Sequence, residues 1–152
     1  MFKPRTILHP TDFSDYSDYA FGIASDLARQ HGAKLLVVHV VETLGPENVT
    51  YGEAVSELEP EGYRLHLQEQ LRRHVPAPEG VTIEYLLVAG EPASEIERVA
   101  RERSCDLIVM GMHGWTGLHR LLMGSIAEQV IRRVPCPVLT TKLPGKNASE
   151  SG

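Results

Sequence analysis

Two kinds of apolar pattern alternate along this chain, and the alternation limits the folds that it can adopt. Short, continuous apolar runs such as residues 35–38 are typical of strands that are buried on both faces of a sheet. Between these runs lie stretches with helical spacing, one of which opens at Pro92, and proline is common in a first helical turn. We therefore expect an open parallel sheet with helices on both faces, connected by right-handed crossovers.

The pattern predicts five strands and four helices. The strands are expected at residues 6–9, 34–41, 81–88, 107–110 and 138–141. The first helix is expected to start after the N-cap Ser14 and to end at Gly32, with Tyr16, Ala20, Ile23 and Leu27 on one face. The others are expected to include 63–74, to open at Pro92 and to span 125–134.

Composition and length indicate one soluble domain. At 152 residues, with a hydrophobic fraction of 42%, the chain is long enough to bury a substantial core. We expect a domain at residues 1–143, followed by a disordered polar tail at 144–152. No apolar run approaches the ~20 residues that span a bilayer, and the N-terminus has no signal-peptide pattern, so we expect a cytoplasmic location without a membrane partner. The net charge of −5, without clustered lysine or arginine, argues against nucleic-acid binding.

Three other features have a structural and a functional interpretation. Cys105 and Cys136 each precede a strand, which favours buried thiols, although a redox role is the alternative. The connector at residues 42–62 holds six glutamates and no lysine or arginine, which favours a solvated connector or, alternatively, a lid or docking loop. The histidines are scattered and lack the paired spacing of a zinc site.

The most specific motif is G-x2-G-x9-G-S, formed by Gly111, Gly114, Gly124 and Ser125. A glycine turn after a strand lets backbone N–H groups approach a ligand, and a helix that starts at Ser125 adds its unpaired N–H groups and its dipole. Together these features predict a pocket for phosphate oxygens. The alternative is that the glycines only shape a strand-to-helix turn. The motif differs from a Walker A loop because no Gly-Lys-Ser/Thr is present.

Because it contains this loop, the chain resembles the universal stress protein family, in its ATP-binding branch. The resemblance rests on four elements that occur in the same order as in the family: residues 10–14, residues 39–41, the glycine loop and residues 136–139. It spans roughly residues 3–142. It implies the strand order 3-2-1-4-5, a Rossmann-like arrangement. This order would place the loops after the first and fourth strands side by side at the switch point, where such sheets bind ligands.

The resemblance also implies particular roles for residues. Asp12 matches the position that hydrogen-bonds the ribose hydroxyls, although turn formation or capping near Ser14 is the alternative. The main chain of Val40 matches the position that contacts adenine through backbone groups. Pocket-wall or backbone-contact positions are matched by Pro10, Thr11, Met110 and Ile126.

We therefore expect an ATP-binding regulatory protein of the stress response that acts as a nucleotide-dependent switch or partner-binding module. Mg²⁺ would be held by the phosphates, and AMP or ADP is the alternative ligand. The resemblance further implies a homodimer through the strand Val138–Thr141, with a monomer as the alternative, and a regulatory protein partner whose identity the sequence does not give. The competing class is a slow ATPase or an autophosphorylating enzyme. For fast phosphoryl transfer, His113 and Arg120 would be the nearest candidates for a base and a charge.

Overall fold

A five-stranded sheet with the order β3-β2-β1-β4-β5 forms the centre of the molecule, and every pair of neighbouring strands is parallel. The computed structural model describes residues 1–41, 60–113 and 124–144. The strands are β1 Thr6–Pro10, β2 Lys34–Val41, β3 Thr82–Ala89, β4 Leu107–Gly111 and β5 Val138–Thr141. The helices are α1 Asp15–His31, α3 Pro60–His74, α4 Pro92–Glu102 and α5 Ser125–Arg133. The predicted fold class and strand order are confirmed.

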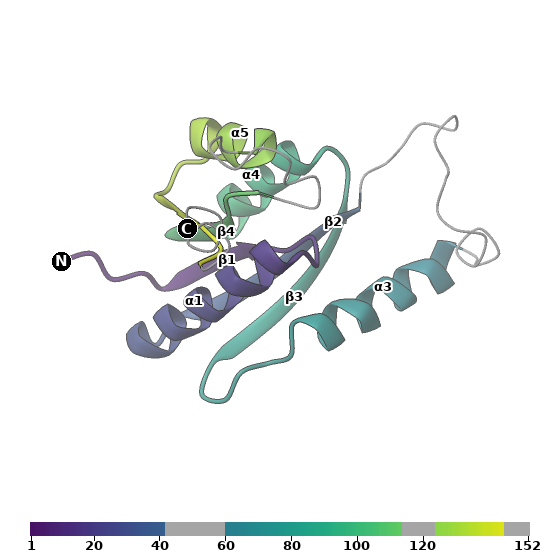
Figure 1. Ribbon diagram of the computed structural model, residues 1–152, viewed down its shortest axis with the longest axis horizontal. Helices are drawn as coiled ribbons and strands as arrows, with labels where there is room; N and C mark the ends of the chain where they lie inside the picture. The colour runs from purple at the N-terminus through teal and green to yellow at the C-terminus, as the bar shows by residue number, and fades with distance from the viewer. Residues whose placement is uncertain (42–59, 114–123, 145–152) are drawn as a thin grey trace, which may run out of the picture.

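Helices cover both faces of the sheet. Helices α4 and α5 lie together on one face, and α1 and α3 lie on the other (Figure 1). The strand order reverses at β1, since β2 lies on one side of it and β4 on the other. Consequently the loops that follow β1 and β4 are neighbours at the carboxyl edge of the sheet, where α/β proteins of this type bind ligands.

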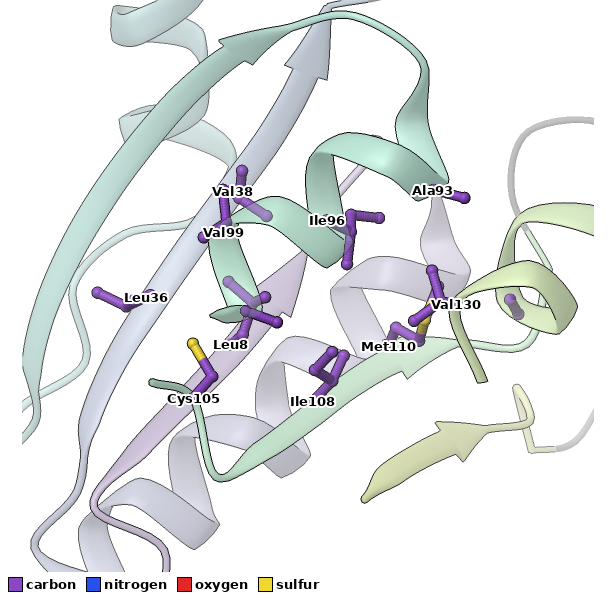
Figure 2. Close-up of a cluster of buried hydrophobic side chains, with 12 residues drawn as sticks. Leu8, Leu36, Val38, Ala93, Ile96, Val99, Cys105, Ile108, Met110 and Val130 are labelled. Atoms are coloured by element: carbon purple, nitrogen blue, oxygen red, sulfur yellow. The ribbon is translucent and has the colours of Figure 1, made fainter. Parts of the chain in front are cut away.

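Successive strand residues point to opposite faces and so supply two cores. Leu8 of β1 belongs to the cluster beneath α4 and α5, whereas its neighbour Ile7 belongs to the cluster beneath α1 and α3. Figure 2 shows the first cluster, in which Ile96 of α4 and Val130 of α5 lie over Ile108 of β4. Because the central strands are buried on both sides, their polar backbone groups are exposed to a ligand only where the strands end.

The helix boundaries follow the predicted capping residues. Ser14 is the N-cap of α1, where its side chain accepts a hydrogen bond from the N–H of Ser17, and Gly32 ends the helix with φ 63°. Helix α4 opens at Pro92, and the carboxylate of Glu91 caps it by accepting from Ala93 and Ser94. These capping interactions satisfy backbone N–H groups in the first turns of α1 and α4.

The predicted face of α1 packs against the core beneath it, since Ala20 is buried in that cluster and Ile23 and Leu27 pack against it. The fully buried positions include Ala20, Ala24 and Ala28, whereas Ile23 and Leu27 are half-buried at the side of the helix. The small side chains of Ala20, Ala24 and Ala28 allow α1 to lie close to the sheet. The hydrophobic pattern therefore identified this face but did not single out Ala24 and Ala28.

Several expectations fall outside the described ranges. Most of the acidic connector at 42–62 and most of the tail at 144–152 lie there, as do Gly114 and Arg120. Both thiols are free, with Cys105 buried and Cys136 half-buried, and burial raises the pKa of Cys105 to about 12. A protonated thiol is a poor nucleophile, which agrees with a structural role for this residue. Within the described ranges, no helix is long and apolar enough to cross a membrane.

Candidate functional site

A cavity of about 270 Å³ opens at the carboxyl edge of the sheet, at the switch point between β1 and β4. It brings together nine of the predicted site residues, namely Pro10, Thr11, Asp12, Val40, Met110, Gly111, Gly124, Ser125 and Ile126. The tenth, Gly114, lies outside the described residues. The sequence interpretation did not assign the remaining lining residues to the site: Ser17, Val38, His39, Pro92, Ile96, Met112, His113 and Ala127.

The loop after β1 forms one side of the cavity and is fixed by side-chain hydrogen bonds. Thr11 Oγ1 accepts the N–H of Phe13 at 3.1 Å and donates to Ser17 Oγ at 3.1 Å. Asp12 Oδ1 accepts the N–H of Ser14 at 3.0 Å, so the turn-forming role considered for this carboxylate is present. A carboxylate accepts several hydrogen bonds at once, and this bond is therefore compatible with a second one to a ligand.

The carboxyl end of β2 presents a backbone donor and acceptor to the cavity. The C=O of Val38 accepts from Thr11 N–H on the β1 side, and the C=O of Val41 accepts from Gly90 N–H on the β3 side, both at 2.9 Å. Because backbone groups of alternate strand residues point to alternate sides, the N–H and C=O of Val40 point toward β1. Strand β1 has already ended at Pro10 there, so this pair faces the cavity.

The N-terminus of α5 forms the opposite side. Gly124 is the N-cap with φ −61° and offers no side-chain cap, while its own N–H donates to Met112 C=O at 2.9 Å. The first bond of the helix runs from Glu128 N–H to Gly124 C=O, so the N–H groups of residues 125–127 have no partner within the helix. These donors and the positive end of the helix dipole lie at the cavity and favour an anion.

Close approach, rather than backbone conformation, explains both described glycines of the motif. A Cβ on Gly111 would lie 3.0 Å from the Cβ and the carbonyl carbon of Tyr16, where α1 packs against the end of β4. A Cβ on Gly124 would lie 3.1 Å from Met112 O. Neither glycine has a left-handed φ, so the two residues bring α1, β4 and α5 together around the cavity.

Two histidines near the carboxyl edge are neutral groups: His9 is fully buried, whereas His39 is half-buried and lines the cavity. His9 is fully buried, with Nδ1 2.9 Å from Val109 O, and burial lowers its pKa from 6.5 to about 4. His39 Nδ1 lies 2.9 Å from Thr11 O, its ring packs 4.4 Å from that of Phe13, and burial lowers its pKa as well. An imidazole that is buried and neutral supplies hydrogen bonds but no positive charge.

The lining of the cavity sets what can bind. Among its described residues Asp12 carries a charge at neutral pH, and no lysine or arginine is present. No cluster of three or more metal-ligating side chains occurs in residues 1–41, 60–113 and 124–144. An anion in this cavity would therefore be held by backbone N–H groups and hydroxyls, while the apolar side chains of Val38, Ile96 and Met110 suit a flat ring.

The model of the universal stress protein family matches residues 3–142. The chain belongs to this family. It is 39% identical over 144 residues to a universal stress protein of Methanocaldococcus jannaschii, a match that covers 93% of this chain and 84% of the relative. The family match includes all five strands of the sheet and the described part of the cavity.

Solved structures agree with this assignment. The universal stress protein UspA from Lactobacillus plantarum is similar with a TM-score of 0.72 and 27% identity, covering 93% of this chain and 100% of that one. A universal stress protein whose crystal structure was determined in complex with cAMP has a TM-score of 0.67 and 26% identity, with coverage of 93% and 99%. The fold of this universal stress protein is thus shared along nearly its full length.

Proposed function

We propose that this universal stress protein binds an adenine nucleotide in the cavity at the switch point. The observation that carries the proposal is the backbone donor and acceptor of Val40, which face the same cavity as the N-terminus of α5. Adenine presents an acceptor at N1 beside a donor at N6, and this order is complementary to one N–H and one C=O. The related protein in complex with cAMP supports the same class of ligand.

The three parts of a nucleotide match three parts of the cavity. The base lies against Val40, the ribose hydroxyls donate to the carboxylate of Asp12, and the phosphate accepts from the N-terminus of α5 and from Ser125. Thr11 and Pro10 hold the loop that carries Asp12. The remaining assigned wall residues are Met110, Gly111, Gly124 and Ile126, with Gly114 proposed from the motif alone.

We propose ATP as the nucleotide, with Mg²⁺ held by its phosphates, and ADP or AMP as the alternative occupants. Hydrogen bonds from backbone groups stabilise a bound ground state and a transition state alike, so they favour binding without accelerating hydrolysis. The protein then acts as a nucleotide-dependent switch or partner-binding module of the stress response, within the single domain proposed for residues 1–143. The partner is a regulatory protein that reads the nucleotide-bound form.

We also propose that two copies pair through β5. This strand pairs with β4 along one edge, and the described residues supply no strand for its other edge. Leu139 on β5 is 37% exposed, and an open apolar edge favours pairing with another strand. Antiparallel pairing of two β5 strands about a two-fold axis would extend the sheet across both copies.

Calorimetric titration with ATP, ADP, AMP and GTP tests the proposed function. We expect adenine nucleotides to bind and GTP to bind at least about tenfold more weakly, because guanine places a donor against the N–H of Val40 and an acceptor against its C=O. Asp12→Ala should weaken binding of every adenine nucleotide. Equal affinity for GTP and ATP would contradict the assignment of Val40, and no binding of adenine nucleotides at millimolar concentration would overturn the proposed function.

A further inference from the structure

Phe13, in the loop after β1, has a backbone conformation that large side chains rarely adopt. Its φ is 66°, in the left-handed region, and among the described residues the one other non-glycine residue with a positive φ is Ser104. A left-handed φ brings the Cβ close to the following carbonyl oxygen, so a bulky residue remains there where the surrounding structure holds it. The strained residue directly follows Asp12, which lines the cavity.

Two imidazole rings from different elements pack against the ring of Phe13. The ring of His39, on β2, has its centroid 4.4 Å away, and that of His74, on α3, has its centroid 4.9 Å away. The Phe13 side chain also packs against the cluster beneath α1 and α3. Rotating the backbone of Phe13 to a negative φ would move its ring out of these contacts, so the contacts stabilise the left-handed conformation.

Both imidazoles are held in place by hydrogen bonds near them. His39 Nδ1 lies 2.9 Å from Thr11 O, a carbonyl of the loop after β1. His74 is the last residue of α3, and the next residue, Val75, is buried and accepts a hydrogen bond at its C=O from Tyr85 Oη at 2.6 Å. The exposed ring of His74 therefore belongs to a helix end that is fixed to β3.

The backbone of Phe13 also sets the orientation of the Asp12 carboxylate. Asp12 Oδ1 accepts the N–H of Ser14 at 3.0 Å, a hydrogen bond that closes across Phe13. The N–H of Phe13 in turn donates to Thr11 Oγ1 at 3.1 Å. A change in φ of Phe13 moves the N–H of Ser14 relative to Asp12, so the direction of the carboxylate follows the conformation of Phe13.

We propose that Phe13 is a positioning residue for ribose recognition, held by His39 and His74 in the conformation that directs the carboxylate of Asp12 toward the ribose. This inference rests on the proposed function and extends it to a helix outside the cavity, because His74 is not among the described lining residues. A carboxylate that is fixed before the ligand enters loses little freedom on binding, so its hydrogen bonds to the ribose hydroxyls contribute more to affinity. Discrimination between a ribonucleotide and its dideoxy analogue then depends on α3.

Calorimetric titration with AMP and with 2′,3′-dideoxy-AMP measures ribose recognition separately from the rest of the nucleotide. We expect the unaltered protein to bind AMP at least about tenfold more tightly than the analogue, which lacks both hydroxyls. Phe13→Ala retains the strain of a Cβ without a ring to hold it, and it should reduce this ratio to about two or less. His74→Ala removes one of the two imidazoles and should reduce the ratio at least about twofold. Both variants should bind the analogue as the unaltered protein does.

Replacement of Phe13 by glycine tests whether His74 acts through the backbone of Phe13. Glycine adopts a left-handed φ without steric cost, so Phe13→Gly should retain most of the ratio. Adding His74→Ala to Phe13→Gly should then have no further effect. The matched control is His66→Ala, an exposed histidine about two turns earlier on α3, which should leave the ratio unchanged.

The outcomes separate failure of this inference from failure of the proposed function. If the unaltered protein binds neither AMP nor its dideoxy analogue, the proposed function is wrong and this inference fails with it. If it binds both with equal affinity, or if the full ratio survives in Phe13→Ala or His74→Ala, positioning by Phe13 is wrong while nucleotide binding stands. An equal effect of His74→Ala with and without Phe13→Gly would also overturn the inference. Circular dichroism melts of each variant ensure that affinity is measured on folded protein.

Discussion

Acid should destabilise this protein through His9, a fully buried histidine of β1. Its pKa is lowered from 6.5 to about 4 because burial disfavours the charged ring, and its Nε2 has no hydrogen-bond partner among the described residues. The folded pKa lies below the unfolded one, so the unfolded chain binds this proton first as the pH falls. The free energy of unfolding is then unaffected by His9 above pH 7, falls below about pH 6.5 and levels off below about pH 4.

The size of the effect follows from the two pKa values. Linkage gives a loss of about 2 kcal/mol at pH 5 relative to pH 8, with a limit of about 3 kcal/mol at lower pH. Urea unfolding of the unaltered protein and of His9→Leu at both pH values isolates this contribution. The variant deprives Val109 C=O of its donor at every pH, so the comparison uses the change with pH rather than the absolute stability. An equal loss in both proteins between pH 8 and pH 5 would show that His9 does not titrate as described.

Three further predictions concern the site and its assembly. Gly124→Val should weaken ATP binding at least tenfold, about 1.4 kcal/mol, because a Cβ at this position would lie 3.1 Å from Met112 O. Gly22→Ala is the control and should leave binding unchanged, because a Cβ at position 22 meets no atom within 4 Å. Unaltered affinity in a folded Gly124→Val protein would argue against phosphate binding by the glycine loop. Sedimentation at micromolar concentration should give roughly twice the chain mass of 16.8 kDa, and a monomer with and without ATP would contradict pairing through β5. Steady-state hydrolysis of Mg-ATP should stay well below ~1 s⁻¹, and faster turnover that His113→Ala abolishes would place the protein among the enzymes.

The fold was predictable because the residue types that mark strands and helix ends can be read directly from the sequence. The continuous apolar run in β2 identifies a central strand, and Ser14, Gly32 and Pro92 mark helix ends by well-understood backbone preferences. Strand ends were displaced by a residue, as at Pro10 and Gly111, because backbone pairing there depends on the neighbouring strand. The pattern also identified the face of α1 that packs on the sheet, but it did not single out Ala24 and Ala28, which are buried there.

The candidate site was predictable where glycine and hydroxyl residues mark it. Gly111, Gly124 and Ser125 occur at a spacing that indicates a ligand loop, but the reason for each glycine, contact with Tyr16 or with Met112 O, required the structure. Ile96 and Ser17 gave no signal because they reach the cavity from helices that the fold brings near. The sequence around a helical residue of this kind does not show whether its side chain lines a cavity or packs in the core.

Amide chemical-shift mapping tests the central claim most directly, because the proposed contacts are largely made by backbone N–H groups. We expect AMP to shift the amide signals of Val40, of residues 110–113 and of residues 124–127, on both sides of the cavity. Amides of α3, such as that of His66, should not move. Shifts confined to α3, or an unchanged spectrum at millimolar AMP, would contradict nucleotide binding at the switch point.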